Sequence, residues 1–238
     1  MQNLALTTAV KMLSDVVYEL KSYAEMEIEA IGLIYGVYGI GKTKASQVIT
    51  DPNSEAFIPF VARIKCDPGI KTPAQLVRAI AAAVRAPSSR NYHEGKLLLR
   101  TVLKRKAQVV FVLDEAGFVL RRKETALAIK DILEEYLTPF VLLGNEELPG
   151  LVERYGGLNE RVKRRVNLDV VRKLDVKAIV ESLGLDGKEE FIDTVYDLVK
   201  RKKPSLLKLS AALKLCAENR KLTKKAVEEA LDRVMLGV

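Results

Sequence analysis

The stretch GVYGIGKT, residues 36–43, follows directly on the apolar run AIGLIY. Its glycines, lysine and hydroxyl residue have the spacing of the pattern G-x-x-x-x-G-K-[ST], at Gly36, Gly41, Lys42 and Thr43. In such a loop, backbone N–H groups wrap phosphate oxygens and the dipole of the following helix favours negative charge. The stretch therefore predicts a strand, a phosphate-binding loop and a helix in that order, although a tight turn with an exposed lysine would have the same spacing.

The glycine-rich loop predicts which residues would hold the phosphates of a nucleotide and its metal ion. Lys42 is expected to reach the β- and γ-phosphates, and the Thr43 hydroxyl is expected to hold Mg²⁺. The predicted nucleotide-binding residues are Gly36, Val37, Tyr38, Gly39, Ile40, Gly41, Lys42, Thr43 and Lys44. The cofactors predicted by this segment are ATP and Mg²⁺.

Two further apolar runs end in polar residues. The run at 109–113 is followed by Asp114 and Glu115, and the run at 139–144 is followed by Asn145. Asp114 at the end of a buried strand can hold Mg²⁺, and Glu115 beside it can polarise an attacking water. Asn145 can orient that water or contact the γ-phosphate. An acidic strand end and a turn-forming Asn are common for structural reasons alone, but after a phosphate loop they predict a catalytic edge of a sheet.

Strand and helix patterns alternate over residues 1–170. Helical spacing of apolar residues predicts helices at 8–28, 42–50, 72–84, 94–106 and 124–136. Apolar runs predict strands at 30–35, 56–66, 108–113, 139–144 and 166–170. This alternation predicts an α/β fold with a parallel sheet covered by helices on both faces.

The pattern changes at residue 171, because helix periods then follow one another without a strand, at 175–183, 188–202, 204–219 and 223–235. We therefore expect a nucleotide-binding α/β domain at 1–170, which includes the helix at 8–28. A small all-helical lid domain is expected at 171–238.

Charge and composition narrow the class of partner. Lys and Arg number 39 against 31 Asp and Glu, which gives a net charge of +8. This excess favours a polyanionic partner such as nucleic acid, although a solvated basic surface would give the same numbers. Cys66 and Cys216 lie far apart without a C-x-x-C partner, so we expect core thiols rather than a disulfide or a zinc site. No apolar run approaches the roughly 20 residues of a membrane span, and we expect a soluble, cytoplasmic protein.

The phosphate loop, the Asp-Glu strand end, the Asn strand end and the helical lid resemble the AAA+ ATPases, a class of P-loop NTPases. Within that class the chain looks most like the DNA-transposition ATPases, namely phage Mu B protein and the TnsC/TniB-type regulators, with ExeA-type ATPases as near relatives. The segments that carry this likeness are IGLIYGVYGIGKT, TPAQLVRAIAAAV, VVFVLDEAG, FVLLGNEEL and KKPSLLKLSAALKLCAE. The resemblance implies an ATPase that self-associates on double-stranded DNA, as a ring or a filament, and selects target sites or recruits a transposase.

The same resemblance implies an arginine that completes the ATP site of a neighbouring subunit. Arg161 precedes the last predicted strand and is the first candidate, with Arg164 and Arg165 as alternatives. The lid departs from the usual G-x-P-R pattern, because Lys202-Lys203-Pro204-Ser205 stands there. Either one of these lysines replaces the missing arginine, or ATP is held more loosely.

Basic residues in loops and at the ends of predicted elements are candidates for contacts with DNA phosphates. These candidates, with one helix-capping Thr, are Lys65, Lys71, Thr72, Arg78, Arg90, Lys96, Arg121, Arg122 and Lys123. By resemblance, the helix that begins at Thr72 faces the duplex. Aromatic residues make up 6% of the chain and Trp is absent, so a stacking platform is not expected. Binding should be mostly electrostatic and only weakly sequence-specific.

Other functions remain open from the sequence. An ExeA-like AAA+ switch that acts on protein partners without DNA is the main alternative. A small-molecule P-loop kinase is disfavoured by Glu115, by the strand before Asn145 and by the separate lid. We also see no winged-helix pattern after the lid, which we expect to disfavour a replication initiator.

Overall fold

The computed structural model describes residues 7–103, 109–185, 188–218 and 223–237. The predicted helix at 94–106, the predicted strand at 108–113 and the predicted helix at 204–219 each extend beyond these limits. Those ends therefore lie outside the described residues.

A five-stranded sheet forms the centre of the α/β part, in the order β2-β3-β4-β1-β5. Every neighbouring pair is parallel. The strands are β1 (Ile31–Gly36), β2 (Val61–Lys65), β3 (Val110–Asp114), β4 (Phe140–Gly144) and β5 (Val162–Leu168). Because all strands run the same way, the C-terminal ends of β1, β3 and β4 lie at one edge of the sheet.

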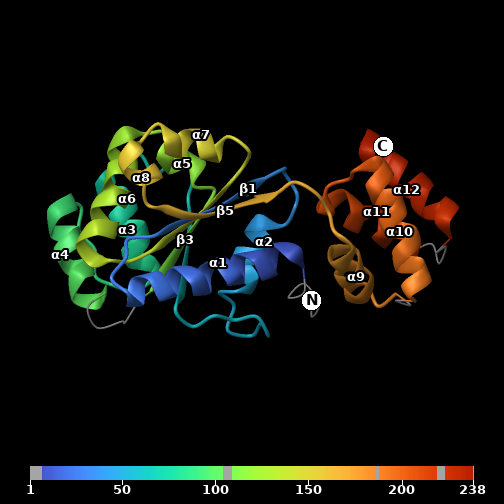
Figure 1. Ribbon diagram of the computed structural model, residues 1–238, viewed down its shortest axis with the longest axis horizontal. Coiled ribbons are helices and arrows are strands. Elements are labelled where there is room, and N and C mark those ends of the chain that lie inside the picture. The colour runs from blue at the N-terminus through green and yellow to red at the C-terminus, as the bar shows by residue number, and fades with distance from the viewer. Residues whose placement is uncertain (1–6, 104–108, 186–187, 219–222, 238) are drawn as a thin grey trace.

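Helices cover both faces of the sheet, as predicted (Figure 1). On one face, Ile34 and Val112 pack in a hydrophobic cluster with α1 and α2. On the other face, Leu33 and Leu113 pack with α3, α4 and α6. Side chains alternate between these faces because successive residues of a strand point to opposite sides. The bounds of these helices are α1 Thr8–Glu25, α2 Lys42–Val48, α3 Pro73–Ala83, α4 Tyr92–Leu103 and α6 Lys123–Tyr136.

Gly32 explains how closely α1 approaches the sheet. A Cβ atom at this position would lie 2.5 Å from Val16 Cγ1, which is far inside van der Waals contact. The absence of a side chain on β1 thus lets α1 lie directly across the strand. This contact fixes the strand that leads into the glycine-rich loop.

The C-terminal region is helical, with α9 (Lys173–Ser182), α10 (Glu189–Lys202), α11 (Leu206–Glu218) and α12 (Lys224–Leu236). It lies beyond the end of β5 in Figure 1. Its apolar side chains join the cluster that contains α1, through Leu168 and Val171. Asp175 at the start of α9 accepts a hydrogen bond of 2.6 Å from the backbone N–H of Thr8. The N–H of Leu207 donates to the Gly39 carbonyl over 3.0 Å, so the helical region contacts the glycine-rich loop directly.

Two strand boundaries differ from the sequence prediction. The second strand was expected at 56–66, but β2 begins only at Val61. Pro59 lacks a backbone N–H and is disfavoured inside a strand, and residues before it form turns. The last strand was expected at 166–170, but β5 spans Val162–Leu168. It is an edge strand whose exposed basic residues hide the alternation that marks a strand.

Three short helices were not predicted: α5 (Gly117–Leu120), α7 (Leu148–Glu153) and α8 (Gly156–Asn159). They are too short to show a helical period in the sequence. Across the described ranges, no helix has the length and apolar character needed to cross a lipid bilayer.

Candidate nucleotide site

The glycine-rich loop joins the end of β1 to the first turn of α2. Gly36, Gly39 and Gly41 have φ values of 146°, 76° and 98°, a region that side chains rarely adopt and glycine adopts freely. A Cβ atom at Gly36 would lie 2.0 Å from the carbonyl oxygen of Leu168. The glycines are therefore required by the course of the backbone, and their spacing is more than a composition effect.

Lys42 points back into the loop that precedes it. Its Nζ donates to the carbonyl oxygens of Gly36 and Val37, each over 2.9 Å. Partial burial lowers the pKa of Lys42, and the nearby carboxylates of Glu115 and Asp114 oppose that shift. The ammonium is thus held at the centre of the loop, where a phosphate group would meet it.

Thr43 and Asp114 bring a hydroxyl and a carboxylate together next to the loop. The Thr43 hydroxyl donates to Asp114 Oδ1 over 3.1 Å, and Asp114 is 2% exposed. Mg²⁺ prefers oxygen ligands and is usually bound by one or two carboxylates together with substrate phosphates. Within the described ranges, no group of three or more His, Cys, Asp or Glu is placed to hold a metal. Thr43 and Asp114 therefore fit Mg²⁺ that arrives with a nucleotide.

Arg63 and Ser46 were not identified from the sequence, yet both bond to this pair. Arg63 Nη2 donates to Asp114 Oδ2 over 2.7 Å, and Arg63 Nε donates to Ser46 Oγ over 2.8 Å. Ser46 Oγ in turn donates to the Thr43 carbonyl over 2.8 Å. These bonds close a ring that links β2, α2 and β3. In the structure, β2 places Arg63 in register with Val112, on the face of the sheet that carries Asp114, and nothing in the sequence alone marked this pairing.

Glu115 lies between two hollows at the end of β3. It has a φ of 58°, so the chain turns sharply after Asp114. One hollow is a cavity of about 410 Å³ between the loop and the helical region, and the other is a groove of about 480 Å³ over the ends of β3 and β4. Glu115 lines both. Its carboxylate is therefore placed to meet groups that enter from either side.

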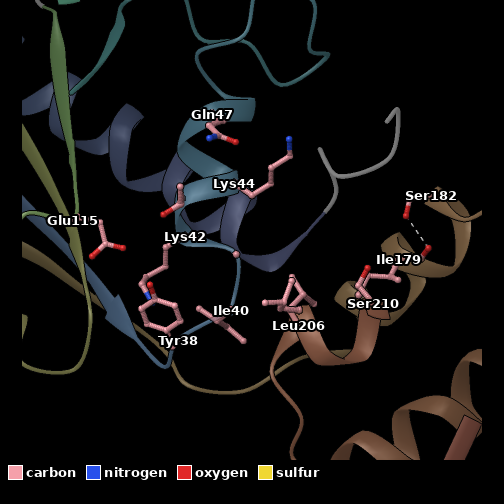
Figure 2. A pocket seen from close by; sticks show the side chains of 14 residues that line it. Tyr38, Ile40, Lys42, Lys44, Gln47, Glu115, Ile179, Ser182, Leu206 and Ser210 are labelled. Carbon is pink, nitrogen blue, oxygen red and sulfur yellow. Dashed lines mark hydrogen bonds between the residues drawn. The ribbon is translucent and has the colours of Figure 1, made fainter. Parts of the chain in front are cut away.

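Figure 2 shows the first of these hollows. Tyr38, Ile40 and Lys42 lie on the loop side, and Ile179 and Leu206 face them from the helical region. The helical region lines the cavity with Ile179, Ser182, Leu206, Leu207 and Ser210. These apolar and hydroxyl side chains suit an uncharged ring system better than a phosphate.

Asn145 lies at the same edge of the sheet as the acidic pair. It lines the groove together with Asp114 and Glu115, and its Oδ1 accepts a hydrogen bond from the N–H of Glu147 over 3.2 Å. This bond fixes the side chain in the turn that follows β4. The structure thus brings Lys42, Asp114, Glu115 and Asn145 to one place, and their catalytic roles stay predictions.

Arg161 lies at the opposite edge of the sheet from the loop. Its carbonyl accepts from the N–H of Ile31, at the start of β1. Its guanidinium is held by the carboxylates of Glu29 and Glu134 and by the Gly157 carbonyl. A position far from the chain's own loop is what a trans-acting arginine requires, but Arg161 would have to leave these partners.

Arg164 and Arg165 lie on β5, in register with Gly32 and Leu33. Both residues are exposed. Arg165 bonds to Glu153 and Asn159, whereas the Arg164 guanidinium is 3.8 Å from Glu19. Arg164 is therefore the most weakly held of the three arginines, and the choice among them stays open.

Neither lysine of the lid motif lines the cavity beside the loop. Lys202 forms ion pairs with Glu228 and Asp232 on α12. Lys203 is exposed and ends α10 in a left-handed conformation. In the described part of the chain, the helical region presents no cation to this cavity, so the arginine missing from the lid motif has no evident substitute there.

The candidates for DNA contacts fall into groups. Lys71 is exposed just before α3 and Arg78 is exposed in the middle of it. Thr72 caps that helix in a capping box with Gln75. Arg90 is exposed in the loop before α4. Among the described residues, no ion pair involves Lys71, Arg78 or Arg90. Their charges are therefore available to a ligand.

The other candidates lie elsewhere. Lys65 and Arg121 line the groove beside Glu115, and Arg121 also pairs with Glu147. Lys96 is largely buried between Asp131 and Glu135. Arg122 and Lys123 are exposed at the start of α6. Lys96 is thus already neutralised, and Lys65 lines the same groove as Asp114 and Glu115.

The first strand of the parallel sheet enters a glycine-rich loop, and the third strand ends in an acidic pair. The chain then continues into a helical region. Together these features define a P-loop NTPase with the AAA+ fold. A family model described as "AAA domain" matches residues 26–152, more than half of the chain. The chain belongs to this family. No curated protein matches the sequence.

Solved structures with this fold include three from origin recognition proteins. Aeropyrum pernix ORC2, with ADPNP and ADP, has a TM-score of 0.63 at 14% identity, over 90% of this chain and 67% of that one. A. pernix ORC1 in complex with DNA gives 0.57 at 20% identity, over 95% and 64%. Drosophila ORC bound to DNA gives 0.58 at 16% identity, over 97% and 62%. This chain spans about two thirds of their length or less, and at these identities the likeness shows the fold alone.

Proposed function

We propose that this protein is an ATPase that converts ATP and water to ADP and phosphate. The observation that carries the proposal is the hydrogen bond of 3.1 Å between Thr43 and Asp114, directly beside the loop that holds Lys42. These groups combine a cation for phosphate with oxygen ligands for Mg²⁺. Mg²⁺ bound there would neutralise charge on the phosphate oxygens.

The remaining polar groups at this edge suit the hydrolytic step. Glu115 would accept a proton from the attacking water, and Asn145 would orient that water or contact the γ-phosphate. The apolar side of the cavity, at Ile179 and Leu206, would hold the adenine ring of ATP. Each role is assigned to a residue that lines one of the two hollows.

The exchange of Glu115 for Gln tests this assignment. The variant should bind ATP as tightly as the wild type, because the loop and the metal ligands are unchanged. Its rate of phosphate release should fall by roughly 10²–10⁴, the usual contribution of a general base. The variant Lys42→Ala should instead lose ATP binding, measured with a fluorescent ATP analogue. Normal turnover of Glu115→Gln would remove Glu115 from its role.

We further propose that ATP-bound subunits assemble on double-stranded DNA with little sequence preference. The proposal is supported by the net charge of +8, by the unpaired basic residues at α3, and by the DNA present with similar folds in A. pernix ORC1 and Drosophila ORC. Phosphate neutralisation would supply most of the affinity. Whether the assembly is a ring or a filament is a question for electron microscopy with ATP and duplex DNA.

Salt dependence tests the DNA proposal. If each subunit neutralises two phosphates, log K per subunit should fall with log salt at a slope of roughly −2, from about −0.9 per phosphate. Fluorescence anisotropy with duplex DNA, with and without ATP, measures this slope. The double variant Lys71→Ala/Arg78→Ala should flatten it and leave ATP binding intact. Lys214→Ala/Arg233→Ala removes the same charge from exposed positions of the helical region and should leave the slope unchanged.

The outcomes separate two functions. An unchanged slope in the α3 variant would move the contact to Arg90 or to the basic residues at 121–123. No ATP-dependent binding to DNA at low salt would favour an ExeA-like switch that acts on proteins. If the titration shows ATP-dependent binding to DNA, we propose regulation of transposition, through target selection and recruitment of a transposase. That last step rests on the sequence resemblance, and co-purification of a transposase with the DNA-bound assembly would test it.

A further inference from the structure

The ring of hydrogen bonds around Asp114 joins three separate elements. Arg63 comes from β2, Ser46 from α2 and Asp114 from β3. Every bond in the ring is between 2.7 and 3.1 Å, with Arg63 donating to Asp114 Oδ2 and the Thr43 hydroxyl donating to Asp114 Oδ1. Ser46 Oγ also lies 3.5 Å from Asp114 Oδ2. Both carboxylate oxygens thus have partners, so the plane of the carboxylate is fixed.

The charges in the ring are well shielded from water. The side chain of Asp114 is 3% exposed, and that of Arg63 is 19% exposed. A planar guanidinium offers a fixed fork of donors, so one Arg can hold two acceptors at set positions. Here the fork spans Asp114 Oδ2 and Ser46 Oγ. A lysine at position 63 would keep the positive charge, but its single ammonium would not span both acceptors in the same geometry.

Ser46 carries the effect of Arg63 to the other metal ligand. Its hydroxyl accepts from Arg63 and donates to the carbonyl of Thr43, in the first turn of α2. This carbonyl and the hydroxyl that bonds to Asp114 belong to the same residue, so holding the backbone of Thr43 also helps to hold its side chain. Arg63 therefore fixes the position of both Thr43 and Asp114, although it is not itself an oxygen ligand.

We propose that Arg63 is a positioning residue for Mg²⁺-dependent nucleotide binding. It holds Asp114 by Oδ2, which leaves Oδ1 beside the Thr43 hydroxyl, 3.1 Å away. The inference rests on the proposed ATPase function, because it concerns the metal that accompanies the nucleotide. It predicts a defect that depends on Mg²⁺ and spares binding of the nucleotide by the loop.

The test compares binding of a fluorescent ADP analogue in Mg²⁺ and in EDTA. In the wild type, Mg²⁺ should tighten binding. In Arg63→Met, the dissociation constant in EDTA should stay within about twofold of the wild type, since the loop is untouched. The Mg²⁺ concentration that gives half of the tightening should rise by about 10- to 100-fold, the usual loss of metal affinity when a partner of a metal ligand is removed. Arg63→Lys should recover part of the metal affinity, and Ser46→Ala should lose part of it.

Controls keep the outcomes distinct. Arg100→Met makes the same exchange at an exposed position of α4 and should behave as the wild type. Circular dichroism reports folding, and Ser46→Ala decides the matter if Arg63→Met fails to fold, because it opens the ring without leaving a charge unpaired. A larger tightening by Mg²⁺ in Arg63→Met than in the wild type, an unchanged effect of Mg²⁺, or a loss of affinity in EDTA as large as the loss in Mg²⁺ would each overturn the positioning role. A wild type that binds no nucleotide would overturn the proposed ATPase function itself.

Discussion

Asp175 joins the beginning of the chain to the helical region, and its removal should cost measurable stability. The residue is 3% exposed. Its Oδ1 accepts from the N–H of Thr8 over 2.6 Å, and its Oδ2 accepts from the N–H of Arg172 over 2.8 Å. One carboxylate thus caps the first turns of both α1 and α9. The exchange Asp175→Ala leaves both N–H groups without this acceptor.

The size of the effect follows from these two bonds. A buried donor left unpaired costs about 1–3 kcal/mol, and Arg172 is exposed enough for water to replace part of its bond. We therefore expect Asp175→Ala to lose about 2–4 kcal/mol of unfolding free energy. For a chain of this length, 1 kcal/mol shifts Tm by about 2–4 °C, so Tm should fall by about 4–16 °C. Asp175→Asn keeps one acceptor and should lose roughly half as much.

Urea unfolding followed by circular dichroism measures the change in free energy. The exposed Asp169, exchanged for Ala, is the control and should stay within about 0.5 kcal/mol of the wild type. If Asp175→Ala also stayed within that range, the two bonds would not contribute as calculated. A lower slope against urea, with an unchanged midpoint, would point to partial unfolding of one region instead.

Two further predictions concern the site and the core. Arg161→Ala subunits mixed with Lys42→Ala subunits should recover part of the ATPase activity that each lacks alone, because a mixed interface pairs an intact loop with an intact arginine. If activity recovers only with Arg164→Ala or Arg165→Ala in place of Arg161→Ala, the trans-acting arginine is Arg164 or Arg165 instead. Burial raises the pKa of Cys66 to about 12, so its thiolate fraction at pH 8 is about 10⁻⁴. A thiol reagent should therefore label Cys66 only after unfolding. Fast labelling of Cys66 in the folded protein would contradict its burial.

The phosphate loop and the acidic strand end were predictable because their chemistry is local. Gly36 to Thr43 form one continuous segment, and Asp114 directly follows the apolar run that becomes β3. Alternation of strands and helices predicted the parallel sheet for the same reason, since each period lies within a short stretch. In these cases the residues that act together are neighbours in sequence or in a repeating pattern.

The ring around Asp114 was not predictable in this way. Arg63 is 51 positions from Asp114 and 17 from Ser46, and their contact depends on the register between β2 and β3. The same limit applies to Lys96, which looked like a free surface cation until α6 placed two carboxylates beside it. Lys65 likewise lies over the groove because β2 and β3 end together. Partners brought together by register or helix packing leave no local signal.

The bond between Thr8 and Asp175 also has a consequence for synthesis of the chain. These residues are 167 positions apart, so the first turn of α1 is made long before the carboxylate that accepts the Thr8 N–H. At about 5–20 residues per second, roughly 8–33 s pass before Asp175 is added. During that time the apolar start of α1, at Ala9 and Val10, lacks the helical region that later covers it. The growing chain therefore carries α1 incompletely covered until the helical region has been synthesised.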